Sequence, residues 1–333
     1  MLQAIRIQSA ALLLATAISL CAQNGQVAGP VVGYVFDASA GSLRPILGIP
    51  GASTLGSPLR LGYMLTSAVV APRQDSAFGV AADGSLHFFL LNAGAATEAG
   101  CTACPASAAA AIVYSPSGTA AALYASGRVQ VLTGLPSAPV AGTALAVASV
   151  AVPSGVRAAA SARSTPPPMA LSDDGLYLLA GEGGSIDLFS ASGGPVRLME
   201  TASRPMVAFA PGGHDAAVVD GRAGVVLIHD VGGAATQQPL APAAAPTLRP
   251  SGLAFSADGT QVLVATAANG TVVSIGTASG TSATISCSCA PTGLASMGSV
   301  LRLNDLAGGP IWLYDNTGAQ PRVVFVPALV PAQ

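Results

Sequence analysis

Short apolar runs separated by turns fill the chain from about residue 31 onwards. Residues 110–134, 168–193 and 252–280 each read as strand, turn, strand, turn, strand. Runs such as TQVLVAT and TVVSI are rich in β-branched residues, which favour strands. No segment keeps a long apolar period of 3.6 residues, and Gly and Pro keep the alanine-rich stretches short. The pattern predicts an all-β chain.

Turn residues recur along these runs at a regular phase. A hairpin glycine returns at spacings of 39 to 57 residues, at Gly41, Gly84, Gly127, Gly184, Gly224, Gly270 and Gly309. A second turn precedes the last six by 9 or 11 residues, at Asp75, Gly118, Gly175, Gly213, Gly259 and Gly298. Four-stranded propeller blades repeat at roughly 40–50 residues. We therefore predict a seven-bladed β-propeller with about 45 residues per blade.

The two ends of the repeat predict how the ring closes. Inner strands are expected near 66–71, 110–115, 168–172, 205–210, 251–256 and 292–297. The N-terminal unit begins later in the phase, at 31–37, and lacks one. We predict that the chain after 322–326 pairs with the N-terminal strands in one blade, because this removes exposed strand edges. The long interval after Gly127 predicts an insertion within 145–168.

One repeat also carries a resemblance. The segment GLAFSADGTQVLVATAANGTVVSI (252–275) resembles the YVTN-type repeat of bacterial secreted propellers, and more distantly NHL and WD repeats. The resemblance covers about 31–328. It departs from the WD pattern, because the Trp-Asp dipeptide is absent and the single tryptophan is Trp312. The resemblance implies the fold and says almost nothing about function.

The N-terminus predicts export. Residues 1–22 have a positive charge, an apolar core of eleven residues and a small residue, Ala22, at a plausible cleavage point. Cleavage there leaves 23–333 as a single domain, in the periplasm or outside the cell. Lipidation of Cys21 is the alternative, but a leucine precedes it where a small residue is needed. The apolar core is too short to span a bilayer of about 30 Å. We expect a monomer that does not span a membrane after cleavage.

The low content of charged residues limits the partners that the chain can be expected to bind. The chain has 13 basic and 15 acidic residues, and 8% of its residues are charged, against about 25% in ordinary soluble proteins. The formal net charge of −2 gives no basic field to hold nucleic acid. Hydrophobic residues make up 51%, which excludes a disordered chain.

Four cysteines remain after the predicted cleavage: Cys101, Cys104, Cys287 and Cys289. Export favours disulfides, and four cysteines allow three connectivities. The repeat phase places the two pairs in the second and sixth units, too far apart to bridge. We expect Cys101–Cys104 and Cys287–Cys289 to pair locally. A four-thiolate zinc site and a redox-active CxxC are the alternatives.

The candidates for catalysis are few. The predicted inner strands contain no Asp, Glu, His, Arg or Lys, although acid–base chemistry needs a titratable group beside its substrate. His87 and His229 lie in apolar strand runs, and His214 follows a Gly-Gly turn. Asp173 and Asp174 precede a glycine and are explained by turn chemistry. We therefore predict no catalytic residue, no metal site, no cofactor and no turnover.

Three arginines are the candidate ligand-binding residues. Arg163, Arg204 and Arg249 precede inner strands, so in a propeller they rim one mouth of the channel. Guanidinium groups bind carboxylates and phosphates in a bidentate manner; the alternative is that each arginine braces its own turn. The leading hypothesis is an exported binding or scaffold module for a protein or a small anionic ligand. The alternative is a propeller hydrolase or lactonase-like enzyme with active residues on its loops.

Overall fold

The computed structural model describes residues 29–105, 109–147, 166–182, 184–201, 205–242, 249–307, 309–318 and 320–328. The predicted signal peptide, Arg163, Arg204 and most of the predicted insertion lie outside these residues. The chain divides into two units, Met1–Pro30 and Val31–Gln333, and the second unit is described below.

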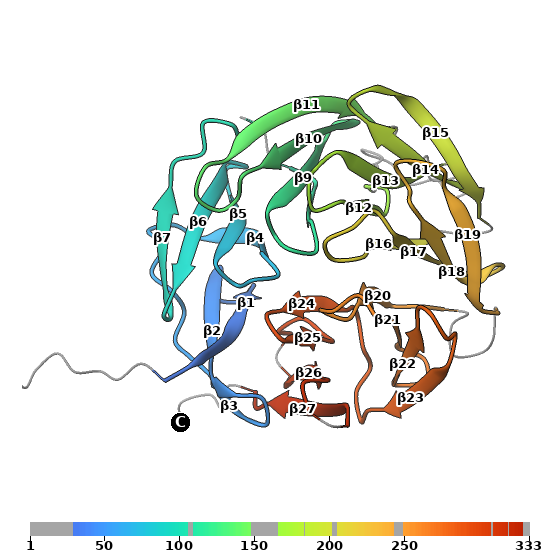
Figure 1. Ribbon diagram of the computed structural model, residues 1–333. Helices are drawn as coiled ribbons and strands as arrows, with labels where there is room; N and C mark the ends of the chain where they lie inside the picture. The colour runs from blue at the N-terminus through green and yellow to red at the C-terminus, as the bar shows by residue number, and fades with distance from the viewer. Residues whose placement is uncertain are drawn as a thin grey trace, which may run out of the picture. The chain divides into compact units, whose positions relative to one another are not determined.

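All the elements that the structure describes in this unit are β-strands, and they form seven antiparallel sheets, or blades, in a ring (Figure 1). The strands of blades 1 to 4 are β1 (Val31–Asp37), β2 (Ser42–Ile49), β3 (Ala52–Leu55), β4 (Leu65–Val70), β5 (Ser76–Ala81), β6 (Leu86–Asn92), β7 (Ala95–Ala99), β8 (Ala111–Tyr114), β9 (Ala120–Ala125), β10 (Arg128–Thr133), β11 (Val140–Ala146), β12 (Met169–Leu171), β13 (Tyr177–Glu182), β14 (Ser185–Ser190) and β15 (Gly193–Glu200). The strands of blades 5 to 7 are β16 (Met206–Phe209), β17 (Ala216–Asp220), β18 (Gly224–His229), β19 (Thr236–Ala241), β20 (Gly252–Phe255), β21 (Gln261–Thr266), β22 (Thr271–Gly276), β23 (Ser282–Ser286), β24 (Ala295–Met297), β25 (Val300–Arg302), β26 (Ile311–Asp315) and β27 (Arg322–Val326). The predicted seven-bladed propeller is confirmed.

Blades 2 to 7 have four strands each in simple sequence order. Their first strands are β4, β8, β12, β16, β20 and β24, and each overlaps one of the six predicted inner strands. In Figure 1, β12, β16, β20 and β24 lie around the centre of the ring. Blade 1 has three described strands in the order β1-β2-β3. The residues before 29 and after 328 lie outside the described part of the chain, so the predicted lack of an inner strand in this unit stays a prediction.

The phased turns depend on left-handed backbone. The first six predicted hairpin glycines all have positive φ, for example 85° at Gly84 and 57° at Gly270, a conformation that tight hairpins require and side chains disfavour. Gly309 is not among the glycines with positive φ. It lies in the longer link between β25 and β26. The second turn has its left-handed residue one position earlier than predicted in two blades, at Gln74 and at Gly212.

Buried side chains between neighbouring blades form the core. Seven clusters of described residues each combine strands of two adjacent blades. The cluster between blades 1 and 7 contains Val35 and Ile46 from the first blade and Val300, Ile311 and Leu313 from the last, all at most 1% exposed. Hydrophobic packing therefore closes the ring.

The predicted pairing of the chain after 322–326 with the N-terminal strands stays a prediction, because residues 329–333 lie outside the described part of the chain. β27 is the outermost strand of blade 7, where it pairs with β26, and it packs beside β3. A parallel bridge between Asp37 and Leu306 joins blades 1 and 7. Among the described residues, no strand from the C-terminal end pairs within the sheet of blade 1, because β27 already completes its own blade.

Candidate functional site

The centre of the ring contains a cavity of about 570 Å³, lined by residues of all six inner strands. Each inner strand pairs on one side only, so its other edge is left without a strand partner. Arg73 is the one charged side chain among the residues lining this cavity, and it pairs with Asp75 at 2.7 Å. The channel therefore presents a neutral wall of apolar side chains, serine hydroxyls and strand edges.

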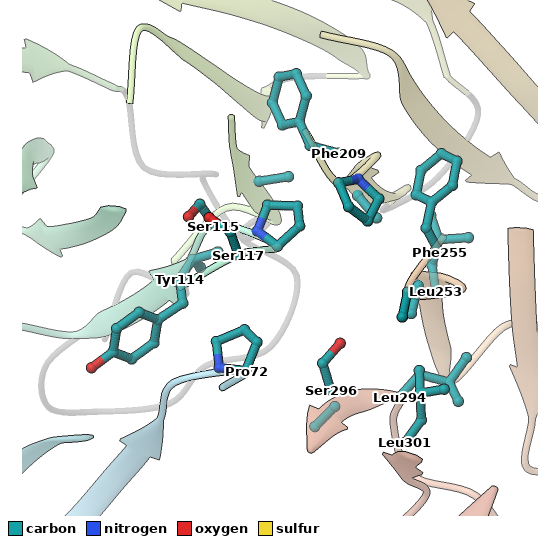
Figure 2. Close-up of a pocket in the computed structure, with 18 of the residues that line it drawn as sticks. Pro72, Tyr114, Ser115, Ser117, Phe209, Leu253, Phe255, Leu294, Ser296 and Leu301 are labelled. Atoms are coloured by element: carbon teal, nitrogen blue, oxygen red, sulfur yellow. The ribbon is translucent and has the colours of Figure 1, made fainter. Parts of the chain in front are cut away.

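The large side chains of the inner strands serve the blade interfaces rather than the channel. Figure 2 shows the rings of Tyr114, Phe209 and Phe255 directed away from the opening, while the Ser296 hydroxyl points into it. Phe209 and Phe255 are 3% and 7% exposed. Burial raises the pKa of Tyr114, so its phenol stays protonated. The opening is thus lined by serine, alanine and proline residues together with aliphatic ones such as Leu253 and Leu294.

Turn hydrogen bonds brace one side of the ring. The backbone N–H groups of Ser117 and Gly212 donate to the two carboxylate oxygens of Asp173, at 2.6 and 2.8 Å. Asp173 therefore connects a turn of blade 4 to turns of blades 3 and 5. Its neighbour Asp174 accepts a hydrogen bond from the Ser172 hydroxyl and pairs with His214 at 2.7 Å. These contacts agree with the turn role predicted for the two aspartates.

Of the three arginines predicted to rim the channel mouth, only Arg249 lies among the described residues. Arg249 is exposed in the link that precedes β20. Because Arg163 and Arg204 lie outside the described residues, the convergence of the three arginines stays a prediction.

A network that the sequence analysis missed lies on blade 2. The Ser85 hydroxyl is 2.7 Å from Nε2 of His87, and Nδ1 of the same ring is 2.7 Å from Oε1 of Glu98. This connectivity is that of a nucleophile, base and acid triad. The histidine side chain is 19% exposed and packs on the ring of Tyr63. The hydrogen bond from His87 lowers the pKa of Glu98.

Asp83 competes for the serine hydroxyl. Its Oδ1 accepts hydrogen bonds from the Ser85 N–H at 2.9 Å and from the Ser85 hydroxyl at 2.6 Å, and these bonds lower the pKa of Asp83. A hydroxyl has one hydrogen to donate, so Ser85 can donate to either Asp83 or His87 at one time. The same turn occurs at Asp37 and Ser39 without a histidine. Ser85 is therefore a turn residue that also contacts an imidazole.

The remaining histidine is held at a strand end. His229 contacts Asp215 through Nδ1 at 2.8 Å and Gln238 through Nε2 at 2.9 Å. The hydrogen bonds with Gln238 and Asp215 raise the pKa of His229. Within the described part of the chain, no three His, Cys, Asp or Glu side chains come together in a group that could hold a metal ion.

Both predicted cysteine pairs are confirmed. Cys101 bonds to Cys104 and Cys287 to Cys289, with Cα–Cα distances of 5.3 and 5.1 Å. Each bridge lies in the link between an outer strand and the next inner strand, so neither ties one blade to a distant one. Disulfides are typical of oxidising compartments and accord with an exported protein. Among the residues that the structure describes, none belongs to a helix long and apolar enough to cross a membrane.

Comparisons with known proteins match the fold and leave the family open. No protein-family model matches the sequence, and no curated protein matches it. A solved structure from Bacteroides uniformis, described as a putative 6-phosphogluconolactonase, is 17% identical with a TM-score of 0.57, over 90% of this chain and 97% of that one. A functionally unknown protein from Desulfotomaculum acetoxidans is 14% identical with a TM-score of 0.58, over 90% and 96%. Kuenenia stuttgartiensis hydrazine synthase is 15% identical with a TM-score of 0.53, over 92% and 99%. At these identities the likeness shows the fold alone.

Proposed function

We propose that this protein is an exported binding module whose central channel takes an uncharged, largely apolar ligand. The observation that carries the proposal is the channel wall, with about 570 Å³ of space and one charged side chain that is already paired. Ligand sites are typically apolar cavities of about 300–1,000 Å³ with a few polar groups. The strand edges and Ser296 supply such groups here.

This chemistry differs from that of an anion site. An anion entering the channel would lose water and meet no free cation among the described lining residues, which is costly. An anionic ligand would instead need the mouth predicted at Arg163, Arg204 and Arg249. That mouth stays a separate proposal.

A charge placed in the channel tests the binding proposal. Val113 lines the channel on β8, and Val140 is 59% exposed on β11. We expect N-phenyl-1-naphthylamine, an uncharged apolar fluorophore, to bind the native chain saturably. Val113→Glu should weaken this binding at least about tenfold, which corresponds to about 1.4 kcal/mol. Val140→Glu adds the same charge outside the channel and should leave it unchanged. Equal binding by both variants would contradict a channel site.

The second candidate is a hydrolase, and the Ser85–His87–Glu98 network favours it. Two structural neighbours, from Bacteroides uniformis and Bacteroides fragilis, are described as putative 6-phosphogluconolactonases. In such an enzyme the serine oxygen would attack an ester carbonyl while His87 takes the hydroxyl proton and Glu98 holds the imidazole. The competing bond to Asp83 is the argument against it.

Matched turn variants separate the two candidates. Ser39 makes the same turn bonds to its aspartate as Ser85 but has no histidine partner. If the protein is a hydrolase, Ser85→Ala should abolish release of p-nitrophenol from p-nitrophenyl acetate, while Ser39→Ala should retain it. If it is a binding module, the native chain should show no turnover that depends on Ser85.

A further inference from the structure

Among the described residues, blade 1 has one strand fewer than the other blades, and the missing place is on its inner side. The hairpin at Gly41 joins β1 to β2, whereas the equivalent hairpins in blades 2 to 7 join the second strand to the third. β1 therefore occupies a second-strand place. It lies between the inner strands β4 and β24, which it contacts, and no described strand fills the inner place beside it.

A cavity occupies this place. Its volume is about 460 Å³, and it is lined by parts of β1, β4 and β24. We call it the inner-strand slot and define it by Val35, Phe36, Ser67, Ala68 and Ala295. It differs from the channel cavity, although the two share some residues of β4 and β24.

The backbone edge of β1 faces the slot. The N–H of Tyr34 donates to Oε1 of Gln74 at 2.7 Å, so a side chain supplies a hydrogen bond that a neighbouring strand would otherwise make. Backbone groups of alternate residues point to the same side of a strand, so those of Phe36 face the slot as well. Gln74 lies at one end of the slot, and the bridge from Leu306 to Asp37 lies at the other.

The charges around the slot favour a neutral occupant. Arg302 and Asp305 are the two charged side chains among the described residues lining it, and they pair with each other at 2.7 Å. The remaining lining is apolar or hydroxyl-bearing, apart from the amide of Gln74. A charged segment would find no partner there and would lose its hydration.

The other blades indicate what fits. Their inner strands are three to six residues long and uncharged, for example AIVY in β8, MVAF in β16 and GLAF in β20. We propose that the inner-strand slot binds an extended, uncharged, apolar segment of about four residues from a partner protein, which adds to β1 as an antiparallel inner strand. This inference goes beyond the proposed function and uses a different cavity.

The proposed occupant is a segment of a partner protein. Occupation of the slot by residues 1–28 or 327–333 of the chain itself is a separate outcome, which the test below distinguishes.

A peptide copied from this chain tests the proposal. The probe is a fluorescein-labelled peptide with the sequence of residues 205–211, PMVAFAP, added to the full oxidised chain and followed by fluorescence anisotropy. We expect saturable binding with a dissociation constant of about 1–100 µM. The same peptide with N-methyl groups on alternate backbone nitrogens keeps its side chains but loses strand hydrogen bonds. It should bind at least about tenfold more weakly.

Two protein variants locate the site. Ser67→Trp fills the slot from an exposed position on β4, and Thr66→Trp adds the same ring one residue away, outside the residues that line the slot. The first should weaken peptide binding at least about tenfold and the second should leave it unchanged. Val113→Glu, in the channel, should also leave it unchanged, so failure here is distinguishable from failure of the channel proposal.

Three outcomes would overturn the inference. The first is equal binding of the plain and the N-methylated peptide, and the second is equal binding by the Ser67 and Thr66 variants. The third is binding only after residues 1–28 or 327–333 are removed, which would mean that the chain fills its own slot.

Discussion

Replacing Ile46 by alanine tests whether packing closes the ring. The side chain is fully buried in the cluster between blades 1 and 7, beside residues such as Val300 and Ile311. The change removes three carbons, worth about 2.4 kcal/mol at about 0.8 kcal/mol per buried methylene. The cavity left behind adds to this, so we expect a loss of about 3–4 kcal/mol in the free energy of unfolding.

The assay follows urea unfolding by the fluorescence of Trp312, the single tryptophan, which lies on β26 of blade 7. Ile49→Ala is the matched control, because Ile49 lies on the same strand but is 58% exposed. That control should change the free energy of unfolding by no more than about 0.5 kcal/mol. Equal unfolding midpoints for the two variants would refute closure by packing.

Three further predictions concern other contacts. Burial raises the pKa of Asp37, but hydrogen bonds from Ser39 and Arg44 outweigh it and lower the pKa below its ordinary value of 3.8. The contribution of ionised Asp37 to the free energy of unfolding should therefore be complete above about pH 4 and should be lost as the pH falls further. The urea midpoints of the native chain and of Asp37→Asn should then converge below that pH. Asp173→Ala should lower the free energy of unfolding by about 1–2 kcal/mol, because two backbone N–H groups of neighbouring blades lose a charged acceptor; no change in the urea midpoint would argue against this brace. Peptide mapping of the oxidised chain should find each disulfide within its local pair, and a link between the two pairs would contradict the blade assignment.

The fold was predictable because its tight turns place glycines at regular intervals in the sequence. Residues such as Gly84 and Gly270 adopt left-handed backbone that side chains disfavour, so the repeat phase could be counted directly. The predicted turn position was wrong by one residue where another residue adopts that conformation, as Gln74 does before Asp75. Closure was less predictable, because the contacts of Ile46 with blade 7 join opposite ends of the sequence and have no local pattern.

The candidate site was harder to predict than the fold. The neutral inner strands were visible as sequence, but the channel volume depends on how far the rings of Tyr114 and Phe209 turn away from the opening. The link between His87 and Glu98 depends on the register of β6 with β7, in which Glu98 lies opposite Phe89. No spacing motif encodes that register. Alternation along β6 could have suggested it, because His87 and Phe89 share a face.

Closure by packing has a mechanical consequence. When two strands share a sheet, a pull along them must shear several backbone hydrogen bonds at once. Here β1 and β27 belong to different blades, and side-chain contacts together with the single bridge between Asp37 and Leu306 hold those blades together. A load applied through both ends would therefore peel blade 1 from blade 7 before any four-stranded sheet has to break. The two disulfides lie within the links before β8 and β24, so they would not carry that load across the seam.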